Sequence, residues 1–315
     1  MTSVRRELYT CVCEKGEVSA RLKGSFLHEA KGREDFPVVG DYVWLLYNGQ
    51  GDSSIGKVLP RKSKFSRTDY SGHAAGYVKT ILEQVVAANF DTVFILSSLN
   101  RDFNTKRILR YITQARHSGG KPVVVLTKAD LCGGFEKEVA AVGEIAGDVA
   151  VIPISSHTGM GLEKLGPYLE PGSTVVFLGM SGVGKSSLLN ALAGREVMAV
   201  KGIREEDARG RHTTTHRQLV KLPSGAYVID TPGMREMGLW DAEEGIRSSF
   251  GEIEELITKC QFADCRHESE PGCAVKAALE TGALSQKQWE YYRNQKEEAA
   301  FVGRKAPASR RNTRK

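Results

Sequence analysis

One segment constrains the fold of this 315-residue chain more than any other. The sequence GMSGVGKS, residues 179–186, follows the apolar run TVVFL and opens KSSLLNAL, which has the apolar spacing of a helix. A glycine-rich turn in this context matches the phosphate-binding P-loop, G-x-x-x-x-G-K-[ST], whose backbone N–H groups and helix N-terminus surround phosphate oxygens. The chain is therefore predicted to contain a nucleotide-binding α/β domain.

The P-loop predicts a phosphate and magnesium site. Lys185 is expected to reach the β- and γ-phosphates and to assist catalysis, and the Ser186 hydroxyl is expected to coordinate Mg²⁺. Further along, AYVIDTPG ends an apolar strand at Asp230, a second Mg²⁺ ligand through water, and the Gly233 N–H is expected to contact the γ-phosphate. The loop residues expected to hold the nucleotide are Gly179, Ser181, Gly182, Val183, Gly184, Lys185, Ser186 and Ser187.

Two other turns suggest that the base is guanine. VVVLTKAD places Thr127, Lys128 and Asp130 after an apolar strand, and VIPISSHTG places Ser155 and Ser156 after the next one. The Asp130 carboxylate can accept from both N1–H and the exocyclic amine of guanine, whereas adenine offers no such pair of donors. The Lys128 stem would lie along the base, and a backbone N–H of the second turn would face the guanine O6. Sites in α/β sheets form at the carboxyl ends of strands, so these turns and the P-loop predict one GTP site.

The order of these motifs is unusual, because the base-reading turn precedes the P-loop. Linear order does not affect which strands meet in a sheet. Joining the former termini through residues 168–173 and opening the chain elsewhere leaves the same contacts. The order base turn, second base loop, P-loop and DTPG is therefore that of a circularly permuted GTPase domain.

Composition and pattern extend this to a chain of several domains. Residues 1–70 show short alternating segments, such as EVSARLKGSFLH and VVGDYVWLLYN, which predict an OB-like β-barrel, although a small sandwich would give a similar pattern. From about residue 85, apolar strands alternate with helical segments, as in a parallel α/β sheet. The expected domains are a barrel over 1–70, the permuted GTPase over 71–236, a mostly helical zinc domain over 237–302, and a disordered basic tail over 303–315.

Charge and apolar content limit where the protein acts. The hydrophobic fraction is 41%, no apolar run is long enough to span a bilayer, and the N-terminus lacks the apolar core of a signal peptide. We therefore expect a cytoplasmic protein. The net charge of +6 is concentrated in residues 57–67 and in the last twelve residues, which suits a polyanion such as RNA; a solvated loop and a disordered tail are the alternative.

Four residues near the C-terminus have the chemistry of a metal site. Cys260, Cys265, His267 and Cys273 follow the pattern C-x4-C-x-H-x5-C and offer three thiolates and one imidazole. This set suits one closed, tetrahedral, structural zinc ion, and unrelated core cysteines are the alternative. The remaining cysteines lack partners of this kind.

Taken together, the motifs resemble one family. VGDYV, VLPRKSKFSR, TKAD, GMSGVGKSSLLN, GRHTTTH, DTPGMRE and CQFADCRHESEPGC are similar to those of the circularly permuted RsgA (YjeQ/YloQ) GTPases, over about residues 10–300. The resemblance implies a monomeric GTP hydrolase that binds the small ribosomal subunit and its rRNA, acts late in maturation, is stimulated by the subunit and leaves after hydrolysis. The family usually has Asn where Thr127 stands.

The resemblance also assigns catalytic roles. Met234 follows DTPG, where other GTPases carry a water-positioning glutamine, so intrinsic hydrolysis is expected to be slow. His212 is expected to position or activate water, and Thr214 to bind Mg²⁺ and sense the γ-phosphate, with Thr213 as a competitor. Two other functions stay open: an RNA-binding scaffold gated by GTP with little intrinsic hydrolysis, and an ATP-dependent P-loop enzyme, which TKAD and SSHTG disfavour.

Overall fold

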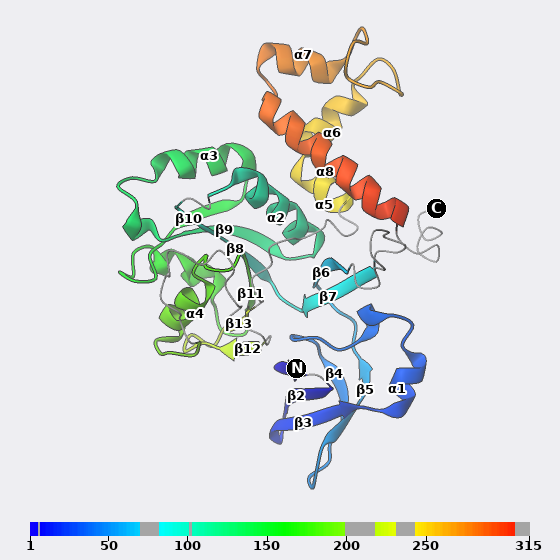
Figure 1. Ribbon diagram of the computed structural model, residues 1–315, viewed down its shortest axis with the longest axis vertical. Helices are drawn as coiled ribbons and strands as arrows, with labels where there is room; N and C mark the ends of the chain where they lie inside the picture. The colour runs from blue at the N-terminus through cyan, green and yellow to red at the C-terminus, as the bar shows by residue number, and fades with distance from the viewer. Residues whose placement is uncertain (6, 70–81, 101–102, 199–217, 231–242, 306–315) are drawn as a thin grey trace, which may run out of the picture.

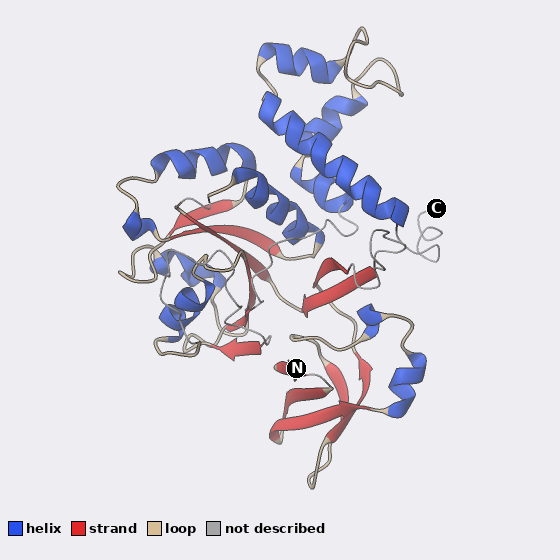
Figure 2. Ribbon diagram, viewed as in Figure 1, coloured by secondary structure: helices blue, strands red, loops and turns tan. Residues whose placement is uncertain are grey.

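The computed structural model describes residues 1–5, 7–69, 82–100, 103–198, 218–230 and 243–305. It divides into an N-terminal β region, a central α/β sheet and a C-terminal helical region (Figures 1 and 2). His212, Thr213, Thr214, Gly233, Met234 and the basic tail from residue 306 lie outside the described residues. None of the described helices is long and apolar enough to cross a membrane.

The central sheet has the order β10-β9-β8-β11-β13-β12, and its first five strands are parallel to one another. Strand β12 is antiparallel to β13. The chain builds outward from β8 through β9 to β10 and then returns to place β11 on the other side of β8. The strands are β8 (Thr92–Ser98), β9 (Lys121–Thr127), β10 (Ala150–Pro153), β11 (Thr174–Leu178), β12 (Gln218–Lys221) and β13 (Tyr227–Asp230).

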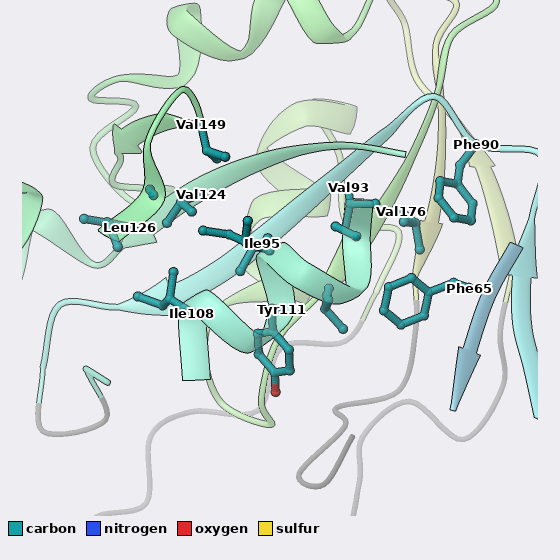
Figure 3. Packing of buried hydrophobic residues seen from close by; sticks show 14 of the residues in the cluster. Phe65, Phe90, Val93, Ile95, Ile108, Tyr111, Val124, Leu126, Val149 and Val176 are labelled. Carbon is teal, nitrogen blue, oxygen red and sulfur yellow. The ribbon is translucent and has the colours of Figure 1, made fainter. Parts of the chain in front are cut away.

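Both faces of this sheet are buried, which explains the continuous apolar runs of its strands. Val93 and Ile95 of β8 face helices α2 (Thr105–His117) and α3 (Glu136–Ala146). Phe94 and Leu96 face α4 (Lys185–Ala193) and the 3-10 helix η3 (Leu162–Tyr168). Figure 3 shows the first of these cores, in which the α2 side chains pack on the strands.

The N-terminal strands follow the order β1-β2-β3-β5-β4, in which β3 and β5 are parallel and the other neighbours antiparallel. This Greek-key arrangement agrees with the predicted OB-like region. Strand β1 also pairs with β12, so that the two sheets are continuous. The elements are β1 (Ser3–Arg5), β2 (Leu8–Cys13), β3 (Gly16–Leu22), α1 (Gly24–Glu29), the 3-10 helix η1 (Arg33–Asp35), β4 (Val43–Leu46) and β5 (Ser53–Val58).

A separate hairpin links the two regions. Strand β6 (Lys64–Asp69) is antiparallel to β7 (Leu82–Ala88), and Phe65 and Val86 belong to the α/β core. Phe65 lies there beside Phe90 (Figure 3). The predicted domain boundary at residue 70 lies within this hairpin.

Three local features of the structure are not set by the sequence pattern alone. The segment EVSARLKGSFLH is not one strand, because β3 ends at Leu22 and α1 follows. The alternating residues Tyr42, Trp44 and Leu46 do not face the core; Val43 and Leu45 do. The segment 240–257 is not one helix, because Phe250 leaves helical geometry and separates α5 (Glu243–Ser249) from α6 (Gly251–Thr258).

Three basic residues of segment 57–67 are paired with carboxylates within the fold. Arg61 makes a bidentate pair with the buried Asp41, Lys62 pairs with Asp91, and Lys64 pairs with Glu83. This segment therefore connects elements of the protein rather than offering a continuous free basic surface.

Candidate functional site

All the predicted nucleotide-binding turns that the structure describes lie at the carboxyl edge of the parallel sheet. The TKAD turn follows β9, the SSHTG turn follows β10, the P-loop follows β11, and Asp230 ends β13. Because β11 and β9 flank β8 on opposite sides, the edge contains a topological switch point, where ligands of open α/β sheets bind. The tertiary structure thus brings together motifs that are separated in the chain.

The P-loop has the backbone shape that a phosphate cradle needs. Gly182 and Gly184 have φ angles of +78° and +104°, which side chains with a Cβ rarely adopt. Gly179 lies so close to β8 that an added Cβ would be 2.7 Å from the Leu96 carbonyl oxygen. Ser181, Ser186 and Ser187 are half-buried around this loop.

Lys185 spans the P-loop. Its ammonium group donates hydrogen bonds to the carbonyl oxygens of Gly179 and Met180, both at 2.7 Å. Burial lowers the pKa of Lys185 to about 8, although the nearby Asp230 carboxylate opposes this shift. Strongly shifted pKa values in a site of this shape are typical of groups that act on a ligand.

Asp230 is the second unusual charge of the site. Burial raises the pKa of its carboxyl group to about 6, and the Lys185 cation partly offsets this effect. Its Oδ1 atom is buried and has no hydrogen-bond partner among the described residues. A buried oxygen without a partner, close to the helix that begins with Lys185 and Ser186, fits a Mg²⁺ ion held with its waters.

The base-reading turn is joined directly to the P-loop. Thr127 is buried, and its Oγ1 donates a 2.6 Å hydrogen bond to the carbonyl oxygen of Val183. Its own carbonyl accepts from the Leu99 N–H at the end of β8. This hydroxyl therefore supports the phosphate loop, and the predicted contact of Thr127 with the nucleotide stays a prediction.

The rest of the turn leaves Asp130, the predicted guanine-selective residue, exposed. Lys128 adopts a left-handed conformation, with φ +63°, and Asp130 lies in the following 3-10 helix η2 (Ala129–Leu131) with its side chain exposed. The Ala129 N–H donates to the Ile154 carbonyl, which ties this turn to the loop after β10. This hydrogen bond joins the two loops that are predicted to read the base.

Ser155 has a structural role that its sequence position did not indicate. Its fully buried hydroxyl accepts hydrogen bonds from the N–H groups of His157 and Thr158. The side chain therefore shapes its own loop, and the half-buried Ser156 lies next to it. The predicted contacts of both serines with the nucleotide stay predictions.

The four predicted zinc ligands come together. Their donor atoms all lie within 4.8 Å of one another. The His267 Nδ1 atom is 3.5 Å from the sulfur atoms of both Cys260 and Cys273, which are 4.0 Å apart. A tetrahedral zinc site needs edges of roughly 3.6–3.8 Å, so the cluster is consistent with structural zinc.

Two neighbours of the cluster were not recognised from the sequence. Glu270 accepts hydrogen bonds from the backbone N–H groups of Arg266, Glu268 and Ser269, and these groups lower its pKa to about 2. This carboxylate holds the loop in which His267 has a left-handed φ of +64°. The Trp289 ring meets the edge of the imidazole. Only spatial proximity identifies these two residues, since no spacing rule links them to the cysteines.

The cysteine–histidine cluster belongs to the C-terminal helical region. Cys273 caps α7 (Ala274–Thr281) by accepting from the Lys276 N–H, and α8 (Gln286–Lys305) supplies Trp289. This region packs on α2 of the central domain. There Arg116 donates to the Ser248 carbonyl, and Arg110 pairs with Glu298.

Comparison with known proteins decides the family. The family model described as RsgA GTPase matches residues 58–240, more than half of the chain. This chain belongs to the RsgA GTPase family. It is therefore a GTPase, and its order of motifs is the circularly permuted one that the sequence predicts.

Full-length relatives and solved structures agree. The chain is 44% identical over 298 residues to the small ribosomal subunit biogenesis GTPase RsgA 2 of Lactiplantibacillus plantarum, covering 95% of this chain and 82% of the relative. It is 42% identical over 315 residues to RsgA 2 of Listeria monocytogenes, covering 100% and 87%. The crystal structure of YjeQ from Thermotoga maritima matches with a TM-score of 0.65 and 29% identity, covering 95% of this chain and 96% of that one. The structure of YloQ, a circularly permuted GTPase, matches with a TM-score of 0.64 at 24% identity, covering 98% and 95%, and supports the fold.

The hydrogen bond of Thr127 can be tested with a shape-conserving substitution. Thr127→Val leaves the buried Val183 carbonyl without its donor, which costs on the order of 1–2 kcal/mol. We expect GTP and GDP to bind roughly 5- to 30-fold more weakly by calorimetry, with unchanged preference for guanine over adenine nucleotides. Thr127→Ser, which keeps the hydroxyl, should bind nearly normally. A selective loss of guanine preference in the valine variant would instead place the hydroxyl on the base.

The buried Asp230 predicts a pH dependence of stability. The folded, nucleotide-free protein keeps this proton up to about pH 6, whereas the unfolded chain releases it near 3.8. The contribution of this group to folding therefore falls as pH rises through that window, by about 3 kcal/mol. Urea unfolding between pH 4.5 and 7.5 should show Asp230→Asn gaining stability relative to the wild type as pH rises. Parallel stability curves for the two proteins would contradict a desolvated carboxylate.

Zinc is predicted to stabilise the C-terminal region rather than the nucleotide site. Cys265→Ala should lose the metal, measured by elemental analysis, and should lose the near-ultraviolet circular dichroism of the packed aromatic residues. GTP affinity should change less than about threefold, because no zinc ligand lies in the cores that support the P-loop. Cys13→Ser, at a half-buried cysteine outside the cluster, is the matched control. Full zinc content in the alanine variant would refute the ligand assignment.

Proposed function

We propose that this protein binds the small ribosomal subunit, acts in its late maturation in the cytoplasm, and leaves after it hydrolyses GTP. The curated relatives carry small ribosomal subunit biogenesis in their names and match nearly the whole chain. The observation that carries the proposal is the joined nucleotide site, in which Thr127 of the base-reading turn holds the P-loop at Val183. A site built in this way recognises base and phosphates together, as a GTP-dependent cycle requires. We expect the protein to act as a monomer.

The described residues suggest how GTP is held. The Asp130 carboxylate reads the guanine edge, and the P-loop N–H groups enclose the phosphates. Lys185 exchanges its two carbonyl partners for phosphate oxygens, which compensates the cost of burying its charge. Ser186, Asp230 and Thr214 would hold Mg²⁺, which would neutralise charge on the phosphates.

Hydrolysis requires a group that positions water. Met234 offers a thioether, which neither donates a hydrogen bond nor orients water well. We propose that His212 supplies this function, with Thr214 or Thr213 sensing the γ-phosphate. The turnover of the free protein is then slow, and binding of the subunit raises it.

Release of the subunit is proposed to follow from the chain order. Residues 231–242 run from Asp230 into α5, which packs closely on α2: an added Cβ at Gly245 would be 2.3 Å from the Thr113 carbonyl oxygen. Loss of the γ-phosphate commonly releases the segment after DTPG. We propose that this release changes how the zinc region lies on α2. The same orientation of that region in the GTP-analogue and GDP states on the subunit would contradict this step.

The turnover of GTP with and without purified small subunits tests the proposed function. We expect stimulation of at least tenfold in the wild type. His212→Ala should lose most of the stimulated rate while keeping GTP affinity, because it removes a group that acts on water rather than on binding. His28→Ala, at an exposed residue of α1, is the control histidine. Subunit binding without any stimulation of turnover would favour the alternative, a GTP-gated RNA-binding scaffold.

A further inference from the structure

The outer face of β4 carries large apolar side chains that point into solvent. Tyr42, which directly precedes β4, and Trp44 and Leu46 within it are 66%, 64% and 47% exposed, whereas Val43 and Leu45 pack on the core of the N-terminal region. Isolated exposed apolar residues are common, but a row of three on one strand face is unusual for a soluble surface. We call this row, with its neighbour Lys57, the β4 face.

A cation lies within this row. Lys57 of β5 is the cross-strand partner of Trp44, and its ammonium group makes no ion pair with any residue that the structure describes. It is thereby unlike Arg61, Lys62 and Lys64, which are all paired with carboxylates. The β4 face thus presents an aromatic ring and an available positive charge side by side.

The backbone holds Trp44 in place. The register of β4 and β5 shifts between Trp44 and Leu45, so Gly56 forms an irregularity in the ladder. A Cβ added at Gly56 would be 3.9 Å from the Trp44 ring, which shows that the indole lies against this glycine. A supported ring loses little conformational freedom when a planar group stacks on it.

We propose that the β4 face binds unpaired bases of single-stranded RNA, with Trp44 stacking on a base and Lys57 contacting a phosphate. This inference rests on the proposed function and identifies part of its contact with the small subunit. Aromatic side chains that stack bases beside cations that follow the backbone are the usual design of single-strand binding surfaces. The surface differs from the usual OB-fold binding surface, which is centred on the second and third strands.

Other occupants fit the β4 face less well. Addition of a partner strand needs a flat edge, and the irregular register and the four-residue length of β4 disfavour it. A protein interface usually excludes lysine from its centre, whereas Lys57 lies directly beside Trp44. Double-stranded RNA offers no accessible base faces for stacking.

Trp44→Ala tests the proposal in the full-length protein. The probe is a fluorescein-labelled 12-nucleotide RNA without self-complementarity, compared with the same sequence as a duplex. We expect binding of the single strand to weaken about tenfold or more in Trp44→Ala and to stay within about threefold in Trp44→Phe. Lys57→Ala should weaken binding and reduce the slope of log affinity against log salt by about 0.7. Leu27→Ala, at a 55% exposed residue of α1, is the matched control.

Several outcomes would overturn the proposal. These are wild-type-like RNA binding by Trp44→Ala, equal binding of single strand and duplex, or no binding of the RNA by the wild type. The proposed function is measured separately, as stimulation of GTP turnover by small subunits. If stimulation is absent, the proposed function fails whatever the oligonucleotide shows; if stimulation is present and Trp44→Ala binds RNA normally, only this inference fails. Weaker subunit binding by Trp44→Ala with unchanged RNA binding would assign the face to a ribosomal protein and also refute it.

Discussion

The hydrogen bond between the Thr127 hydroxyl and the Val183 carbonyl is the contact on which the nucleotide site depends. It joins the turn after β9 to the turn after β11 across the end of β8, which is the strand that both of them flank. Without this contact, no side-chain hydrogen bond among the described residues would join the predicted base-reading turn to the phosphate-binding loop. With it, the permuted chain recovers a single site, because the geometry of a sheet depends on neighbouring strands and not on their order in the chain.

Whereas the Thr127 hydrogen bond stabilises the site, the burial of the charged groups of Lys185 and Asp230 has a cost in free energy. Burial shifts both pKa values toward the neutral forms, and the attraction between the two groups offsets only part of that cost. The fold therefore maintains two poorly solvated charges at the carboxyl edge of the sheet. Phosphate oxygens and a hydrated Mg²⁺ ion would provide stronger partners for these two groups, so part of the binding free energy would come from offsetting the cost of their burial.

The N-terminal and C-terminal regions each pack around a small hydrophobic cluster instead of a large core. The C-terminal helical region packs around Cys273, Trp289 and Tyr292, and the loop of its cysteine–histidine cluster is held by the carboxylate of Glu270. The barrel has a small core of its own and gains support from its junction with β12. Both regions are attached to the central domain through β1, α2 and the β6–β7 hairpin. These contacts join each of them to the domain that carries the nucleotide site.

The sequence by itself determined those sites whose residues lie close together along the chain. The P-loop, the TKAD turn and the cysteine–histidine set are short patterns whose spacing follows from bond lengths and helix geometry, so they could be recognised along with the parallel α/β sheet. The structure decided what depends on distant partners. The alternation in β4 predicted a strand but not which set of alternate side chains faces the core. Val43 and Leu45 point inward because the neighbouring strands place the core of the N-terminal region on that side. The hydroxyl of Thr127 bonds Val183 and that of Ser155 shapes its own loop, because buried donors and acceptors must be satisfied by whatever the folded chain brings near them.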